Sequence, residues 1–77
     1  MNKILLFAHL KEQAGDGSLT MDVSGKTVKE LRNHLETETN LGSLAGIMIA
    51  INEEFATDET VINAEDVIAL IPPVSGG

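Results

Sequence analysis

Two short segments of the chain are almost continuously apolar. Residues 3–8 read Lys-Ile-Leu-Leu-Phe-Ala, and residues 67–71 read Val-Ile-Ala-Leu-Ile. A run of this length is typical of a strand that is buried on both faces of a sheet. We therefore expect both runs to be strands and to be central neighbours in one sheet. Pro72 and Pro73 must end the second strand, because neither can donate a backbone hydrogen bond.

Alternating patterns indicate further strands. In residues 18–24 and 47–51 the larger apolar side chains fall on odd-numbered positions, which is typical of a strand with two different faces. Residues 55–56 are expected to form a short strand. In the loop that follows, we expect Val61 and Ile62 to be buried.

The clearest helix begins at Thr27. Thr27 and Glu30 fit a capping box, in which each side chain bonds a free backbone N–H of the other. One apolar stripe follows, formed by Val28, Leu31 and Leu35. The helix should end near Glu38, and a single helical turn is expected over residues 10–14. The order β, β, α, β, short β, β predicts an α+β fold, the β-grasp (ubiquitin-like) roll, with one main helix on one face of a mixed sheet.

Length and composition narrow the possible functions. Seventy-seven residues suffice for one domain, which we place at residues 1–71, followed by a flexible tail at 72–77. The chain has no Cys, two His, two Phe and no Trp or Tyr, with a net charge of −7. Nucleic acid is an improbable partner, because the charge repels phosphates and few rings can stack on bases. No apolar stretch approaches a membrane span, and we expect a cytoplasmic protein.

Charge is distributed unevenly. All five basic residues lie in the first 32 positions, whereas residues 33–77 hold eight acidic residues and no basic one. Two interpretations remain open, a solvated acidic surface and a docking face for a basic partner.

No catalytic set is visible in the sequence. His34 is interpreted as a residue at the flank of the helix rather than a metal ligand. Three acidic pairs, Glu53-Glu54, Asp58-Glu59 and Glu65-Asp66, could hold a hard cation, but turn residues on a solvated rim explain them better. We expect no metal site.

The final six residues, Pro-Pro-Val-Ser-Gly-Gly, carry the most specific signal. The prolines stiffen the exit from the sheet, and six extended residues span about 20 Å. Gly76 and Gly77 have no Cβ, so another protein's backbone can approach closely. The tip offers one carboxylate, that of Gly77. The pattern indicates an arm that enters a narrow active site; the alternative is a frayed chain end.

These residues resemble the small subunits of molybdopterin synthases, the MoaD family of β-grasp sulfur carriers. The similarity covers the whole chain and is carried by residues 3–8, 27–31, 50–52 and 66–69 and by the ending at 72–77. Ser75 stands where a Thr is commoner.

The resemblance implies a mechanism. An E1-like (MoeB-like) enzyme that uses ATP would adenylate Gly77, a sulfur donor protein would supply sulfur, and the resulting thiocarboxylate would act within the large (MoaE-like) subunit of a heterotetrameric synthase. There it would donate sulfur to cyclic pyranopterin monophosphate. No cofactor would be bound stably. The tail residues that would enter the partner are Pro72, Pro73, Val74, Ser75 and Gly76.

The resemblance also implies a partner interface beside the tail, at Phe55, Leu70 and Ile71. For Phe55 the alternative is a place in the core. Three other functions stay open: a sulfur carrier for thiamin, tRNA thiolation or cysteine synthesis; a protein modifier that joins Gly77 to lysine amines; and an interaction domain with an inert tail.

Overall fold

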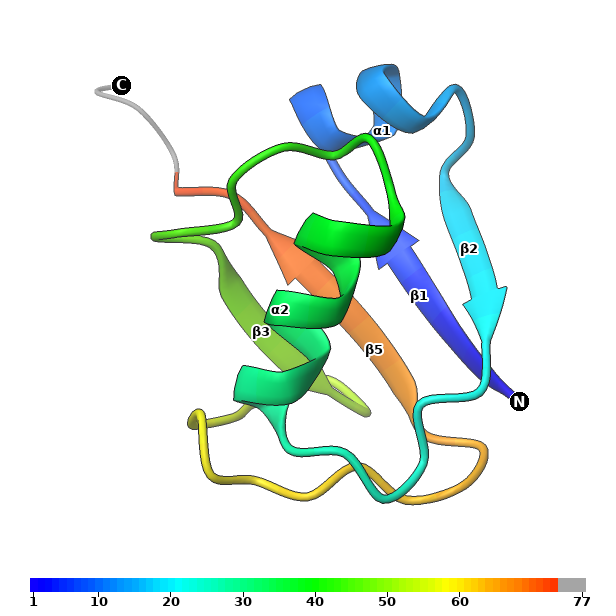
Figure 1. The fold of residues 1–77 in the computed structure, drawn as a ribbon, viewed down its shortest axis with the longest axis vertical. Coiled ribbons are helices and arrows are strands. Elements are labelled where there is room, and N and C mark those ends of the chain that lie inside the picture. The colour runs from blue at the N-terminus through cyan, green and yellow to red at the C-terminus, as the bar shows by residue number, and fades with distance from the viewer. Residues whose placement is uncertain (74–77) are drawn as a thin grey trace.

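The computed structural model describes residues 1–73 and consists of one mixed sheet covered on one face by a helix. Figure 1 shows the elements in chain order. They are β1 (Asn2–Leu6), α1 (His9–Ala14), β2 (Ser18–Met21), α2 (Val28–Glu38), β3 (Met48–Ile51), β4 (Glu54–Phe55) and β5 (Val67–Ile71). This confirms the predicted order and the α+β class with one main helix.

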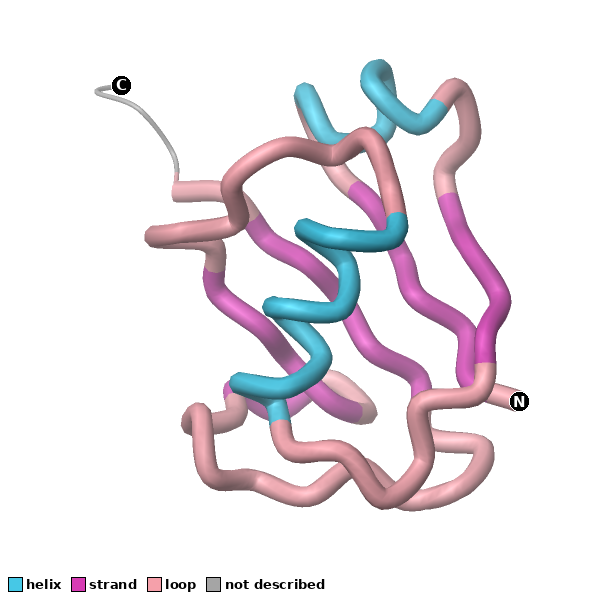
Figure 2. The backbone as a smooth tube through the Cα atoms, in the orientation of Figure 1, coloured by secondary structure: helices cyan, strands magenta, loops and turns pink. Residues whose placement is uncertain are grey.

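The sheet has the strand order β2-β1-β5-β3-β4. β1 and β5 are parallel neighbours, with Leu6 opposite Leu70, and the other pairs are antiparallel. The two apolar runs are therefore adjacent, as predicted. Figure 2 shows α2 crossing the sheet diagonally on one side only.

Helix α2 begins and ends as its sequence predicts. The Thr27 hydroxyl accepts a hydrogen bond from the Glu30 N–H, and the Glu30 carboxylate accepts one from the Thr27 N–H at 2.9 Å. The Thr27 N–H and, to a smaller extent, the Thr27 hydroxyl donate hydrogen bonds to the Glu30 carboxylate. Because these bonds favour the charged form, they lower the pKa of Glu30. The predicted short helix is α1, which ends at Gly15 with φ of 76°.

The core lies between α2 and the sheet. The fully buried side chains of its centre are Ile4, Leu10, Leu31, Leu35, Leu44, Ile62, Ile68 and Leu70. Asn2 is the buried polar residue: its amide nitrogen donates to the carbonyl oxygens of Asn63 and Asp66, and its amide oxygen accepts from the Val23 N–H. These three bonds tie the start of β1 to two loops.

The expectation that residues 3–8 and 67–71 are buried on both faces was wrong. Strand β1 ends at Leu6, Lys3 is exposed, and Val67 keeps 37% of its exposure. The reason is that α2 covers one face of the sheet and no described element covers the other. Val61 was also misassigned: it is 53% exposed, whereas its neighbour Ile62 is buried. Adjacent side chains in extended backbone point to opposite sides.

Candidate functional site

The chain leaves the sheet after Ile71. This last residue of β5 pairs with Met48 of β3, whereas the pairing with β1 ends one residue earlier, at Leu6 and Leu70. Pro72 is half-buried and Pro73 is exposed. Figure 1 places this exit at the same end of the sheet as α1. The predicted tail residues Val74, Ser75 and Gly76 and the predicted carrier Gly77 lie outside the described residues.

An apolar groove runs across the uncovered face of the sheet and reaches the exit. We call it the open-face groove; it is lined by Leu5, Phe7, Ala50, Asn52, Glu53, Phe55, Val67, Ala69 and Ile71. Both aromatic residues of the chain line it, and Phe55 is 67% exposed and Phe7 45%. Solvent-exposed aromatic rings in one contiguous apolar surface mark an interaction site more often than a structural one.

Phe55 is held in place by a tight hairpin. Asn52 and Glu53 connect β3 to β4 with φ of 51° and 70°, as a two-residue hairpin turn with left-handed backbone requires. The Asn52 side-chain oxygen accepts from the Val67 N–H, and its nitrogen donates to the Asp66 carboxylate, both at 2.9 Å. The turn is thereby locked to the start of β5, and Phe55 stands opposite Ala50.

The three residues predicted to form a partner interface have different environments. Phe55 is exposed, which excludes the alternative of a place in the core, and its role in binding stays a prediction. Ile71 is half-buried and lines the open-face groove. Leu70 is fully buried in the core and presents no surface to a partner, so its assignment to the interface was wrong. In β5 the even-numbered side chains face α2 and the odd-numbered ones face the groove, because strand side chains alternate.

Sequence reasoning did not place Phe7 and Val67 in the lining of the open-face groove. Both were assigned to strands buried on two faces, although the alternation of side chains along a strand already indicated which residues share a face. Leu5 and Phe7 share one parity and lie on the face opposite the fully buried Ile4.

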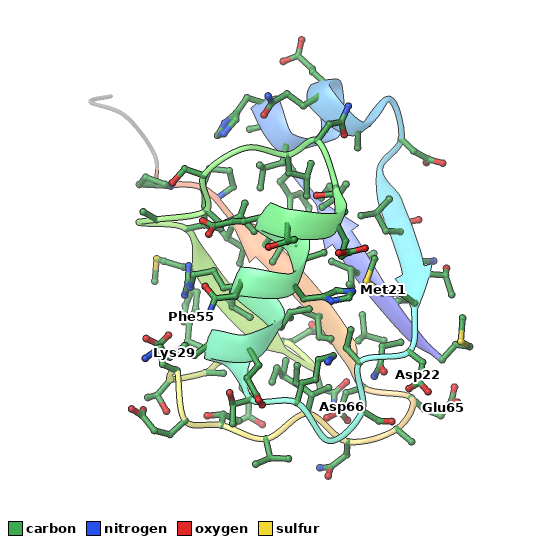
Figure 3. All side chains as sticks on the ribbon, in the orientation of Figure 1. Met21, Asp22, Lys29, Phe55, Glu65 and Asp66 are labelled. Carbon is green, nitrogen blue, oxygen red and sulfur yellow. The ribbon has the colours of Figure 1, made fainter. Side chains whose placement is uncertain are left out.

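Of the three acidic pairs, Glu65-Asp66 is bonded to nearby parts of the fold through both side chains. The Asp66 carboxylate accepts from the Asn63 N–H and from Asn52, and Glu65 accepts from the amino group of Met1 at 3.0 Å. Figure 3 shows Glu65 and Asp66 on the loop that leads into β5. In residues 1–73 no three His, Asp or Glu side chains gather as metal ligands would, and no helix there is long and apolar enough to cross a membrane.

Comparisons with known proteins agree over the whole length. The model of the ThiS family matches residues 4–77. The molybdopterin synthase sulfur carrier subunit of Arabidopsis thaliana is 36% identical, over 97% of this chain and 81% of its own.

Two solved structures are similar in fold and sequence. SAMP1, the small archaeal modifier protein 1 of Haloferax volcanii, is 33% identical with a TM-score of 0.74, covering 99% of this chain and 98% of that one. In a complex of subunits 1 and 2 of the molybdopterin-converting factor from Helicobacter pylori, the matching chain is 28% identical with a TM-score of 0.71, covering 99% of this chain and 97% of that one.

Proposed function

The chain belongs to the ThiS family, and on that basis we propose that it is the sulfur carrier subunit of a molybdopterin synthase. The observation that carries the proposal is its full-length similarity to sulfur carrier subunits of that synthase. The Pro-Pro-Val-Ser-Gly-Gly ending adds support. In this role the chain is the non-catalytic small subunit, and partner proteins supply the catalytic groups.

The reacting group is the carboxylate of Gly77. A carboxylate is a poor electrophile, so one oxygen must first become part of a leaving group. An E1-like partner transfers AMP from ATP to the carboxylate and releases pyrophosphate. A sulfide-level nucleophile from a sulfur donor protein then displaces AMP and leaves a thiocarboxylate. Because the chain contains no Cys, it has no side-chain thiol that could carry the sulfur as a persulfide.

In the second half of the cycle the thiocarboxylate acts in the large subunit. The tail, Pro72 to Gly76, enters that subunit and brings the sulfur of Gly77 to cyclic pyranopterin monophosphate. The sulfur is transferred, and water restores the carboxylate. The Helicobacter pylori complex, in which a similar chain is bound to subunit 2, supports a large-subunit partner for this chain.

The open-face groove is the proposed docking surface for these partners. It lies beside the exit from β5 and carries Phe7, Phe55 and Ile71. Aromatic side chains that become buried in an interface commonly carry much of its binding energy. Glu53 also lines the groove, and Glu54 follows it in the chain, so a partner with basic residues at its rim is favoured.

Reconstitution with ATP, an adenylating enzyme and a sulfur source tests the proposal. Intact-mass spectrometry should show a gain equal to one oxygen-to-sulfur exchange, located in the C-terminal peptide. The gain should disappear on incubation with the large subunit and cyclic pyranopterin monophosphate. A chain whose mass never changes under these conditions would refute the proposal.

Two tail variants sharpen this test. Extension beyond Gly77 should abolish loading, and Gly76→Ala should slow loading or transfer, because a methyl group would collide with a cleft built around bare backbone. Both should leave the melting temperature of the fold unchanged. A retained extension that still supports molybdenum cofactor synthesis would contradict the assignment of the reaction to Gly77.

The similarity to SAMP1 supports a second candidate function, protein modification. In that case the activated Gly77 is attacked by a lysine amine of another protein, and an isopeptide bond replaces the bond to AMP. The two functions share the adenylation step and differ in the nucleophile that follows. Peptide mass spectrometry of conjugates formed with ATP would find lysines that carry the C-terminal peptide of this chain only if the chain is a modifier.

A further inference from the structure

The guanidinium of Arg32 on α2 bonds to backbone rather than pointing to solvent. Its Nη1 donates to the carbonyl oxygen of Leu44 at 2.8 Å and to that of Ile47 at 2.7 Å. The side chain keeps 22% of its exposure, and its Nη2 lies 3.5 Å from a carboxylate oxygen of Asp58. A guanidinium holds its donors in a rigid plane, so two bonds from one nitrogen fix two backbone carbonyls relative to the helix.

Glu36, one turn further along α2, holds the same segment from its other side. Its Oε2 accepts from the Leu44 N–H at 2.6 Å. Both the N–H and the carbonyl of Leu44 are therefore bonded to side chains of α2. The Leu44 carbonyl also accepts from the Ile47 N–H, at 3.1 Å, which closes the turn. We call these contacts to residues 44–47 the Arg32–Glu36 clamp.

The clamped turn leads directly to the exit from the sheet. Ile47 precedes Met48, the first residue of β3, and Met48 pairs with Ile71, the last residue of β5. On the other side of β5 the pairing with β1 has already ended at Leu70. The start of β3 is thus the last ladder partner of β5 before Pro72, and Figures 1 and 2 show the loop before β3 beside this exit.

We propose that Arg32 is a positioning residue for the reaction at Gly77: by fixing the carbonyls of Leu44 and Ile47 it sets where and in which direction the chain leaves β5. This rests on the proposed function, in which the partner docks on the open-face groove and must receive the chain end in its own active site. The position of the exit from β5 relative to the open-face groove is then fixed within the carrier. Six residues span at most about 20 Å, so a displaced exit changes how far and in which direction they must reach into the partner's active site. Mutations far from the chemistry can slow a reaction by misplacing the reacting groups, by as much as about 100-fold for about 1 Å.

Loading kinetics separate positioning from docking and from stability. We would measure thiocarboxylate formation against the concentration of carrier for wild type, Arg32→Ala, Arg32→Lys and Asp58→Asn, each corrected for its folded fraction. Arg32→Ala should lower the saturating rate by about tenfold or more and change KM by less than about twofold, because the groove is intact. Arg32→Lys keeps a cationic donor but not the rigid plane, so its saturating rate should lie between those of Arg32→Ala and wild type.

Asp58→Asn is the matched control. The substitution removes the negative charge from the contact between Asp58 and Arg32, in which the Asp58 side chain is 52% exposed. It leaves both bonds from Arg32 to backbone carbonyls, so the rate of loading should equal that of wild type. Phe55→Ala should show the opposite split, a raised KM with an unchanged saturating rate. Saturating rates for Arg32→Ala equal to those of wild type would overturn the proposal.

A second pair of variants keeps the test decisive if Arg32→Ala does not fold. Glu36→Ala removes the acceptor for the Leu44 N–H, whereas Glu36→Gln retains one. Glu36→Ala should load at least about threefold more slowly than Glu36→Gln at saturation; equal rates would refute the clamp. If the wild-type chain is not loaded with sulfur but forms conjugates, the proposed sulfur-carrier function fails while the proposal for Arg32 can still be tested. The same variants are then compared by their rates of conjugation, because adenylation of Gly77 precedes both reactions.

Discussion

Truncation of Phe55 gives the most direct test of the open-face groove. The ring is 67% exposed in the free chain and lines the groove, so it contributes little to folding and has much surface left to bury. Phe55→Ala should therefore leave the fold intact and weaken binding to the large subunit of the synthase.

The expected loss follows from the exposed area. A Phe side chain buries about 180 Å² at most, and two thirds of this, about 120 Å², remains available to a partner. At about 25 cal/mol per Å² this corresponds to about 3 kcal/mol, and to about 2 kcal/mol after allowing for the Cβ that Ala retains. Binding should weaken about 30- to 150-fold.

Isothermal titration calorimetry of the large subunit with each variant measures this change. Val61→Ala is the matched control, because Val61 is also exposed, at 53%, but does not line the groove. It should bind like wild type. Equal affinities for Phe55→Ala and Val61→Ala would refute the docking assignment. If Phe55→Ala lost the circular dichroism spectrum of the wild-type fold, the claim that the ring is dispensable for folding would be refuted.

Further outcomes concern the fold. Leu70→Ala should cost about 2–5 kcal/mol in thermal unfolding and Ile71→Ala clearly less, because only Leu70 is fully buried. Asn2→Leu should destabilise by at least about 2 kcal/mol in urea titration, since it leaves the partners of three hydrogen bonds unpaired. Thr27→Ala should cost about 1 kcal/mol through loss of the helix cap. The pKa of Glu30 is lower in the folded state than in the unfolded state, so the stabilisation that Glu30 provides is present above its unfolded pKa and is lost as pH falls through its folded pKa. The difference in unfolding free energy between wild type and Glu30→Gln should therefore narrow on acidification. A difference that stays constant would contradict this.

Prediction from the sequence succeeded where the cause is local. The capping box of α2 needs only Thr27 and Glu30 three residues apart, and the structure contains both of its bonds. The end of β5 follows from the missing N–H of Pro72 and Pro73. The candidate carrier residue Gly77 likewise came from the tail pattern and stays a prediction, since it lies outside the described residues.

The errors in prediction concern which face of a strand is covered. A continuous apolar run indicates that both faces of a strand avoid water. It does not show whether the second face is covered by the same chain or by a partner. In β5 the result was that Leu70 was assigned to an interface while Val67 was overlooked, although strand alternation makes them face opposite sides.

The sequence by itself determined the order of the elements, the boundaries of α2 and the place where the sheet ends, because these depend on neighbours within a few residues. Only the tertiary structure decided that α2 covers one face, that Phe7 and Phe55 line one groove on the other, and that Arg32 reaches Leu44 and Ile47. Those relations join residues distant along the chain, and they arise when α2 packs on the sheet and brings β1, β3 and β5 side by side.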